Sequence, residues 1–151
     1  MITINEFKNK LSSGSRLLGI DLGTKRIGIA ISDYNQKIAT PLQTLDRSKH
    51  NKLIAKLESI VKENDIKGII IGNPINMDGT YGKSSQSAKD TAINISNKFN
   101  IPVSLWDERL STVGAFNLSS ELDINVSKRE KDIDRFAAAF ILQGALDFIQ
   151  N

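Results

Sequence analysis

The chain lacks cysteine altogether and contains a single histidine, His50, among its 151 residues. A disulfide framework, a thiolate nucleophile and zinc sites built from cysteine and histidine are therefore excluded. A Ser-His-Asp triad would depend on His50, which lies in the polar stretch DRSKHNK with no nucleophile motif around it. Catalytic side chains must then be carboxylates, hydroxyls, amides, lysines or arginines, and carboxylates without histidine favour a hard cation such as Mg²⁺ or Mn²⁺.

Long apolar runs are absent as well. No stretch approaches the roughly 18 apolar residues of a membrane-spanning helix, and the first residues, MITINEFKNKLSSGSR, lack the apolar core of a secretory signal. We therefore expect a cytoplasmic protein with no membrane partner. The net charge of +3 is compatible with a nucleic-acid partner but is not evidence for one, because the placement of charge matters more than its sum.

The polar residues 1–14 end in SSGS, and we expect a loosely attached extension with a short helical turn. Residues 15–151 have the length and composition of one domain. Apolar runs predict strands over residues 16–21, 26–33, 38–45, 67–72 and 101–106. Helical spacing predicts helices over residues 49–64, 84–99, 110–121 and 132–148, the second capped by Ser84 or Ser85.

These elements predict an α/β fold with one mixed five-stranded sheet and helices on both faces. The short turns between the first three strands make them antiparallel, and Pro41 places the third strand at an edge. The last two strands follow helices, so we expect right-handed crossovers that leave them parallel to the first.

Carboxylates stand where two of these strands end. Asp21 closes the first strand, on the same face as Leu17 and Gly19, and is either a site residue or an Asx-turn cap for the following turn. Asp107 and Glu108 close the last strand on opposite faces, and a helix start explains only one of them, more naturally Asp107.

The last helix adds two more acids, Asp132 and Asp134, in its expected first turn, where the helix dipole alone favours them. Ligand sites of open α/β sheets form beyond the carboxyl ends of the strands. Three acids that converge there repel one another, and two divalent cations about 4 Å apart offset that repulsion and clamp a phosphodiester. The pattern thus predicts a two-metal nuclease site.

Four motifs carry a resemblance to a known family. LGIDLGTKRIGIAISD, IIIGNPINMDG, LWDERLST and IDRFAAAFILQGALD resemble, in order and spacing, the bacterial pre-16S ribosomal RNA nucleases, also called Holliday-junction-resolvase-like proteins. The resemblance implies a ribonuclease H-like fold and an activity in 5′-end maturation of the 16S ribosomal RNA precursor. It implies structured RNA as substrate, with branched DNA as an alternative, ribosomal particles as further partners, and a monomer or weak homodimer.

The resemblance also implies roles for individual residues. Asp21, Glu108 and Asp134 would be both the catalytic acids and the ligands of two Mg²⁺ or Mn²⁺ ions. Asp132 would either assist the metal or cap the helix, and we favour the cap. The family usually has an apolar or aromatic residue where this chain has Asn73, which we expect to alter loop packing or a substrate contact.

Basic residues surround the predicted acids. Each of them alone is more simply a solvated surface charge, but together they would form a phosphate-binding rim. Arg26 and Arg109 are the strongest candidates because each lies within a few residues of an acid. The full set is Lys25, Arg26, Arg109, Lys128, Arg129 and Lys131. The loop 73–83 would offer backbone N–H groups to phosphate, or would simply connect two elements.

Three other functions compete with the nuclease. Sugar-kinase and actin-like ATPases also use an Asp-x-Gly-Thr turn, but they need two such lobes, and the motif occurs once here. A non-catalytic RNA-binding or transcription-associated module would leave the acids unexplained, because carboxylates repel phosphate in the absence of metal. A Holliday junction resolvase would differ only in its substrate and its paired, dimeric sites.

Overall fold

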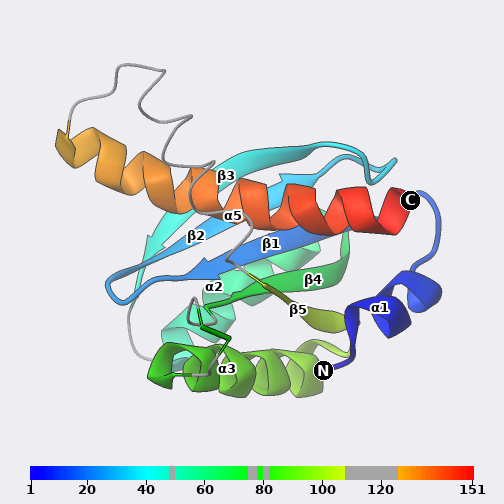
Figure 1. Ribbon diagram of the computed structural model, residues 1–151, viewed down its shortest axis with the longest axis horizontal. Coiled ribbons are helices and arrows are strands. Elements are labelled where there is room, and N and C mark those ends of the chain that lie inside the picture. Colours follow the sequence, from blue (N-terminus) through cyan, green and yellow to red (C-terminus); the bar gives the residue numbers. More distant parts are fainter. Residues whose placement is uncertain (48–49, 75–77, 80–81, 108–125) are drawn as a thin grey trace.

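The computed structural model describes residues 1–47, 50–74, 78–79, 82–107 and 126–151, and of residues 50 and 126–134 it describes the backbone alone. The elements are α1 (Ile4–Lys10), β1 (Arg16–Leu22), β2 (Arg26–Ser32), β3 (Ala39–Asp46), α2 (His50–Glu63), β4 (Ile66–Asn73), α3 (Lys83–Phe99), β5 (Val103–Asp107) and α5 (Val126–Gln150) (Figure 1). The helix predicted over residues 110–121 lies outside the described residues.

The five strands form one sheet in the order β3-β2-β1-β4-β5. β1 pairs antiparallel with β2, and β2 pairs antiparallel with β3, whereas β4 and β5 run parallel to β1. The predicted mixed α/β sheet is therefore confirmed. Pro41 lies on the edge strand β3, as expected, next to a register shift that falls between Ile29 and Ala30 on β2.

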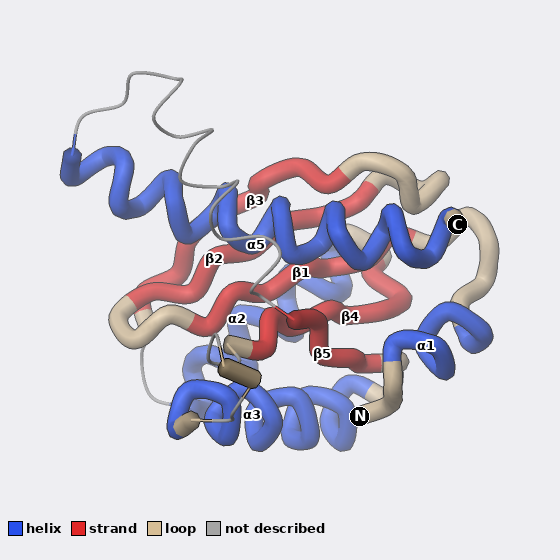
Figure 2. Tube along the Cα trace, viewed as in Figure 1, coloured by secondary structure: helices blue, strands red, loops and turns tan. Residues whose placement is uncertain are grey.

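Helices cover both faces of the sheet, also as predicted (Figure 2). Alternation along each strand sends neighbouring side chains to opposite faces, so β4 places Ile69 and Ile71 in one core and Ile70 in the other. The first core joins the sheet to α2 and α3, and the second joins it to α1 and α5. Asp21 shares its sheet face with Leu17, which belongs to the second core, so its carboxylate lies on the α5 side.

Gly19 lets α5 approach the middle of the sheet closely. A Cβ at this position would lie 2.7 Å from Cβ of Leu142 and 3.0 Å from the carbonyl oxygen of Ala138. No side chain fits between β1 and the helix at this point without a shift of one of them. The crossing is therefore set by a glycine two residues before Asp21, and it places α5 over that end of β1.

The expectation of a loosely attached extension at residues 1–14 is wrong. Residues Ile4–Lys10 form α1, with a capping box in which Thr3 and Glu6 exchange hydrogen bonds. Phe7 is fully buried, in contact with the backbone of Gly68 on β4. The composition of the segment is polar, but Phe7, with Ile2, Ile4 and Leu11 packed around the same core, fixes the short helix on the sheet.

The last helix starts earlier than predicted. α5 begins at Val126 rather than at Asp132, so the basic stretch at residues 126–131 is helical and not a loop. Asp132 and Asp134 consequently lie beyond the first turn, which holds no acidic residue. The interpretation of Asp132 as a helix cap is therefore wrong, because capping and dipole effects are confined to the terminal turn.

The start of α3 differs from the prediction in a smaller way. Its N-cap is Gly82, with no side-chain capping bond, rather than Ser84 or Ser85. Ser85 is instead buried, and its hydroxyl group bonds to another element.

Candidate functional site

The carboxyl ends of three parallel strands meet at one edge of the sheet. Ile20 of β1 is level with Ile71 of β4, so Asp21 is the next residue toward that edge. Asn73, the last residue of β4, pairs with Asp107, the last residue of β5. This is the edge at which open α/β sheets bind ligands. The structure thus brings the ends of the two acid-bearing strands to one side, as the sequence predicted.

Asp21 is half-buried at this edge, on the face that α5 covers. α5 runs antiparallel to β1, so its earlier turns extend beyond Gly19 toward Asp21 (Figure 1). Residue 134 lies four positions before Ala138, on the same face of the helix and one turn nearer this edge. The backbone therefore brings residue 134 toward the end of β1.

The turn after Asp21 is held by a residue that the sequence analysis did not single out. The guanidinium of Arg47 donates hydrogen bonds to the carbonyl oxygen of Gly23, at 2.8 Å, and to Oγ of Ser87 on α3, at 3.1 Å. Its backbone N–H donates to the carbonyl oxygen of Lys25, at 2.9 Å. Arg47 thus links the β1–β2 turn to α3. The pairing of β2 with β3 indicates this role, because Arg26 pairs with Asp46 and Arg47 is the next residue, beside the β1–β2 turn.

Gly23 itself is required by the same turn. A Cβ added there would collide with the carbonyl oxygen of Arg26. The backbone therefore folds back on itself immediately after Asp21 and Leu22. The second strand can begin at once, while the end of the first strand remains at the edge of the sheet.

Asn73 packs the end of β4 against α3. The hydroxyl of Ser85 donates a hydrogen bond of 2.6 Å to its side-chain oxygen, Oδ1. The amide of Asn73 therefore makes a contact between β4 and α3 within the protein. In the family that the sequence resembles, an apolar or aromatic residue usually stands here, and such a side chain could not accept this bond.

The predicted basic rim is described only in part. Lys25 is exposed and Arg26 is half-buried, and both lie on the turn and strand that follow Asp21. Lys128 and Arg129 lie in the first turn of α5, of which the backbone alone is described. Arg109 lies outside the described residues, as does Glu108, which directly follows the end of β5.

A pair of hard cations suits the predicted donor set chemically, since carboxylate oxygens are the ligands that Mg²⁺ and Mn²⁺ prefer. The close approach of β1 and α5 at Gly19 supports such a set, because it brings the helix that carries Asp134 over the strand that carries Asp21. Among the side chains that the structure describes, no three His, Cys, Asp or Glu residues form a metal-binding group. Glu108 and the side chain of Asp134 are not among them.

Solved structures of low sequence identity share this fold. RuvC of T. thermophilus in complex with a Holliday junction substrate superposes with a TM-score of 0.55 at 10% identity, over 89% of this chain and 96% of that one. The yeast mitochondrial Holliday junction resolvase Ydc2 gives a TM-score of 0.50 at 12% identity, over 97% and 84%. The architecture is therefore ribonuclease H-like.

Sequence relatives are much closer. A protein of Pelagibacter ubique named "Putative pre-16S rRNA nuclease" is 60% identical over 151 residues, the full length of both chains. A protein of the same name from Ruegeria pomeroyi is 44% identical over 149 residues, which cover 99% of this chain and 97% of the relative. A family model described as "RuvX: Holliday junction resolvase" matches residues 15–148. This chain belongs to the RuvX family.

Proposed function

We propose that this protein is a divalent-metal-dependent nuclease that hydrolyses phosphodiester bonds in the precursor of 16S ribosomal RNA, at its 5′ end. The observation that carries the proposal is the arrangement at the carboxyl edge of the sheet. Asp21 is the second-last residue of β1, Glu108 follows the last residue of β5, and α5 crosses β1 at Gly19 with residue 134 one turn nearer that edge. The names of the Pelagibacter and Ruegeria relatives support the same reaction.

In this proposal Asp21, Glu108 and Asp134 hold two Mg²⁺ or Mn²⁺ ions. When bound, such a pair supplies an activated water and a stabilised leaving oxygen for phosphodiester hydrolysis. The carboxylates would fix the position of the ions, with Asp21 carried by β1 and Asp134 by α5. Lys25 and Arg26, four and five residues after Asp21, are suited to bind the phosphates that flank the reacting bond.

The proposed place of the reaction is the cytoplasm, where the ribosomal RNA precursor is processed. In the described part of the chain, no helix is both long and apolar enough to cross a membrane. Ribosomal particles are proposed as the setting in which the RNA is presented, with the protein acting as a monomer or weak homodimer.

Cleavage of a precursor 16S RNA fragment in Mg²⁺ tests this function. The wild-type chain should shorten the 5′ end, whereas Asp21→Asn should reduce the rate by about 10³-fold or more, because the amide is a poor ligand for the cation. Asp65→Asn is the matched control, since Asp65 directly precedes β4 at the opposite edge of the sheet. Equal cleavage by wild type and Asp21→Asn would refute the metal-site assignment.

A junction resolvase is the second candidate, favoured by the family description and by the superposition on RuvC. Its test is a four-way DNA junction offered beside the RNA, with the mass of the protein measured in solution. Resolvases cut two strands with paired sites, so symmetric junction cleavage by a dimer would replace the RNA proposal.

A further inference from the structure

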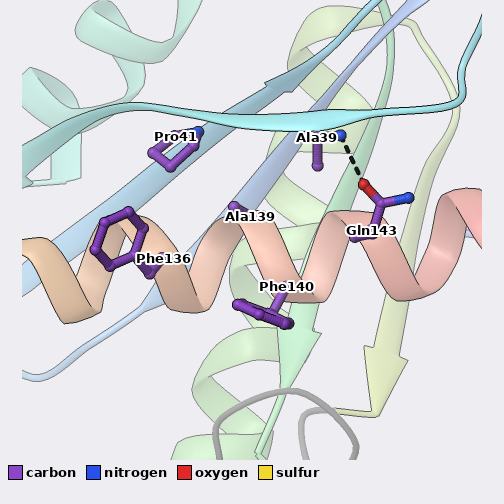
Figure 3. A pocket seen from close by; sticks show the side chains of 6 residues that line it. All are labelled: Ala39, Pro41, Phe136, Ala139, Phe140 and Gln143. Atoms are coloured by element: carbon purple, nitrogen blue, oxygen red, sulfur yellow. Dashed lines mark hydrogen bonds between the residues drawn. The ribbon is translucent and has the colours of Figure 1, made fainter. Parts of the chain in front are cut away.

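A small apolar pocket lies between the edge strand β3 and helix α5 (Figure 3). Its volume is about 200 Å³, which is below the roughly 300–1,000 Å³ of pockets that hold drug-sized ligands. Its walls are formed by Ala39, Pro41, Phe136, Ala139, Phe140 and Gln143. Phe136 on the helix and Pro41 on the strand lie at one end of the pocket, and a hydrogen bond between Ala39 and Gln143 lies at the other (Figure 3).

The strand beside this pocket is not free to pair with a peptide. The backbone N–H of Ala39 donates to Oε1 of Gln143, at 2.8 Å, and the same side chain donates from Nε2 to the carbonyl oxygen of Lys37, at 2.8 Å. Pro41, two residues further along, has no N–H to offer. An added β-strand needs these backbone groups, so the geometry argues against strand addition as the use of this edge.

The pocket lies on the same face of the sheet as Asp21. Pro41 pairs with Ala30 on β2, which pairs with Gly19 on β1, so the three residues form one row across the sheet. Asp21 lies two residues beyond that row, and two strand spacings separate β3 from β1, about 10 Å. The backbones of Pro41 and Asp21 are therefore about 12 Å apart, so a nucleic acid whose phosphate sits at Asp21 passes within about two nucleotides of the pocket. Phe136 lies within one turn of residue 134 on α5, on a different face of the helix.

The lining of the pocket suits a flat ring. Aromatic side chains bind unpaired bases by stacking, without regard to base identity, because every base has a π-face. Phe136 offers a ring, and the pyrrolidine ring of Pro41 lies across from it (Figure 3). A single base is small enough for the volume, whereas a base still paired in a duplex cannot leave its partner without an energetic cost.

We propose that this pocket receives one unpaired nucleobase of the substrate, within about two nucleotides of the bond that is cut. The inference rests on the proposed nuclease function and deepens it: the substrate must have a single-stranded or splayed nucleotide that close to the cleavage point. Sequence-tolerant stacking then contributes affinity, while the acids at the edge determine where the chain is cut.

Photo-crosslinking tests the proposal in the intact protein. Precursor RNA carrying 5-iodouridine at one position at a time is bound in Ca²⁺ to the wild-type chain and to Asp21→Asn, irradiated, and mapped by mass spectrometry of the protein fragments. We expect one substituted position, within about two nucleotides of the cleavage point, to crosslink to a peptide that contains Phe136 or Phe140. Phe136→Leu keeps an apolar side chain but removes the ring, and should weaken RNA binding at least about fivefold.

Phe148→Leu is the matched control, because Phe148 is a partly exposed aromatic residue of the same helix that lies outside the pocket. It should bind RNA like wild type. Crosslinks confined to other surfaces, together with unchanged RNA binding by a folded Phe136→Leu, would overturn the proposal. It would also be overturned if two copies of the protein associated through Phe136, because the pocket would then be a protein interface. A crosslink in the pocket without Mg²⁺-dependent cleavage would support base binding while refuting the nuclease function.

Discussion

The guanidinium of Arg47 donates a hydrogen bond to the carbonyl oxygen of Gly23, and the two residues are 24 positions apart in the sequence. A second bond, to Ser87, extends the link to α3. An exposed residue at the end of β3 thereby fixes the turn that follows Asp21. The position of the proposed metal ligand thus depends on contacts of the first turn with the residue that follows β3 and, through it, with α3.

Arg47→Ala should lower nuclease activity more than it lowers stability. Because Arg47 is exposed, its loss should change the free energy of unfolding by no more than about 1 kcal/mol. Activity should fall about tenfold or more, since small displacements of a catalytic group are costly. Rates on precursor RNA and urea unfolding of the same samples test both statements. Lys62→Ala, which removes an exposed ion pair with Glu58, is the control and should change neither quantity appreciably.

Gly19→Ala and Gly19→Val should separate α5 from β1. The added atoms meet Leu142 and the backbone of Ala138, and we expect losses of about 1–3 kcal/mol in unfolding free energy, larger for valine. The helix should also move away from Asp21, so activity should fall in the same order. Thermal unfolding and RNA cleavage test this. Ser13→Ala, on an exposed loop, should stay within about 0.5 kcal/mol of wild type. If Gly19→Val were as stable as the wild type, the close packing of α5 on Gly19 would be contradicted.

Phe7→Ala should destabilise the whole domain. The ring is fully buried against β4, so its removal should cost about 3–5 kcal/mol, as for other large core residues. Urea unfolding followed by circular dichroism measures the loss. The exposed Lys10, at the end of the same helix, provides the control as Lys10→Ala. If the N-terminal segment were only loosely attached, both variants would unfold like the wild type.

Asp33 gives a prediction about pH. Backbone N–H groups of Ile38 and then Lys37 donate to its carboxylate, and they hold its pKa below the ordinary value of 3.8. A carboxyl whose pKa is lowered by folding stabilises the protein above that ordinary value, and this contribution is lost as the pH falls toward the folded pKa. Asp33→Asn should therefore be less stable than wild type near neutral pH. The difference should shrink below about pH 4 and should not grow there.

The amino-acid sequence determined which strands form the sheet and in what order they and the helices follow one another along the chain. Apolar alternation and short turns identified the β1–β2–β3 meander, Pro41 identified its edge, and helical spacing identified α2 and α3. These are local signals, because the spacing of apolar residues shows which face of an element is buried. The position of Asp21 at the end of a strand also followed from such a pattern.

Only the tertiary structure decided what each buried face contacts. The docking of Phe7 beside Gly68, the crossing of α5 at Gly19 and the bond from Arg47 to Gly23 join residues that are far apart in the chain. The pocket beside Pro41 also joins residues that are far apart in the chain. Periodicity reports burial but not the partner, and the partner depends on the shape of neighbouring elements once they are packed together.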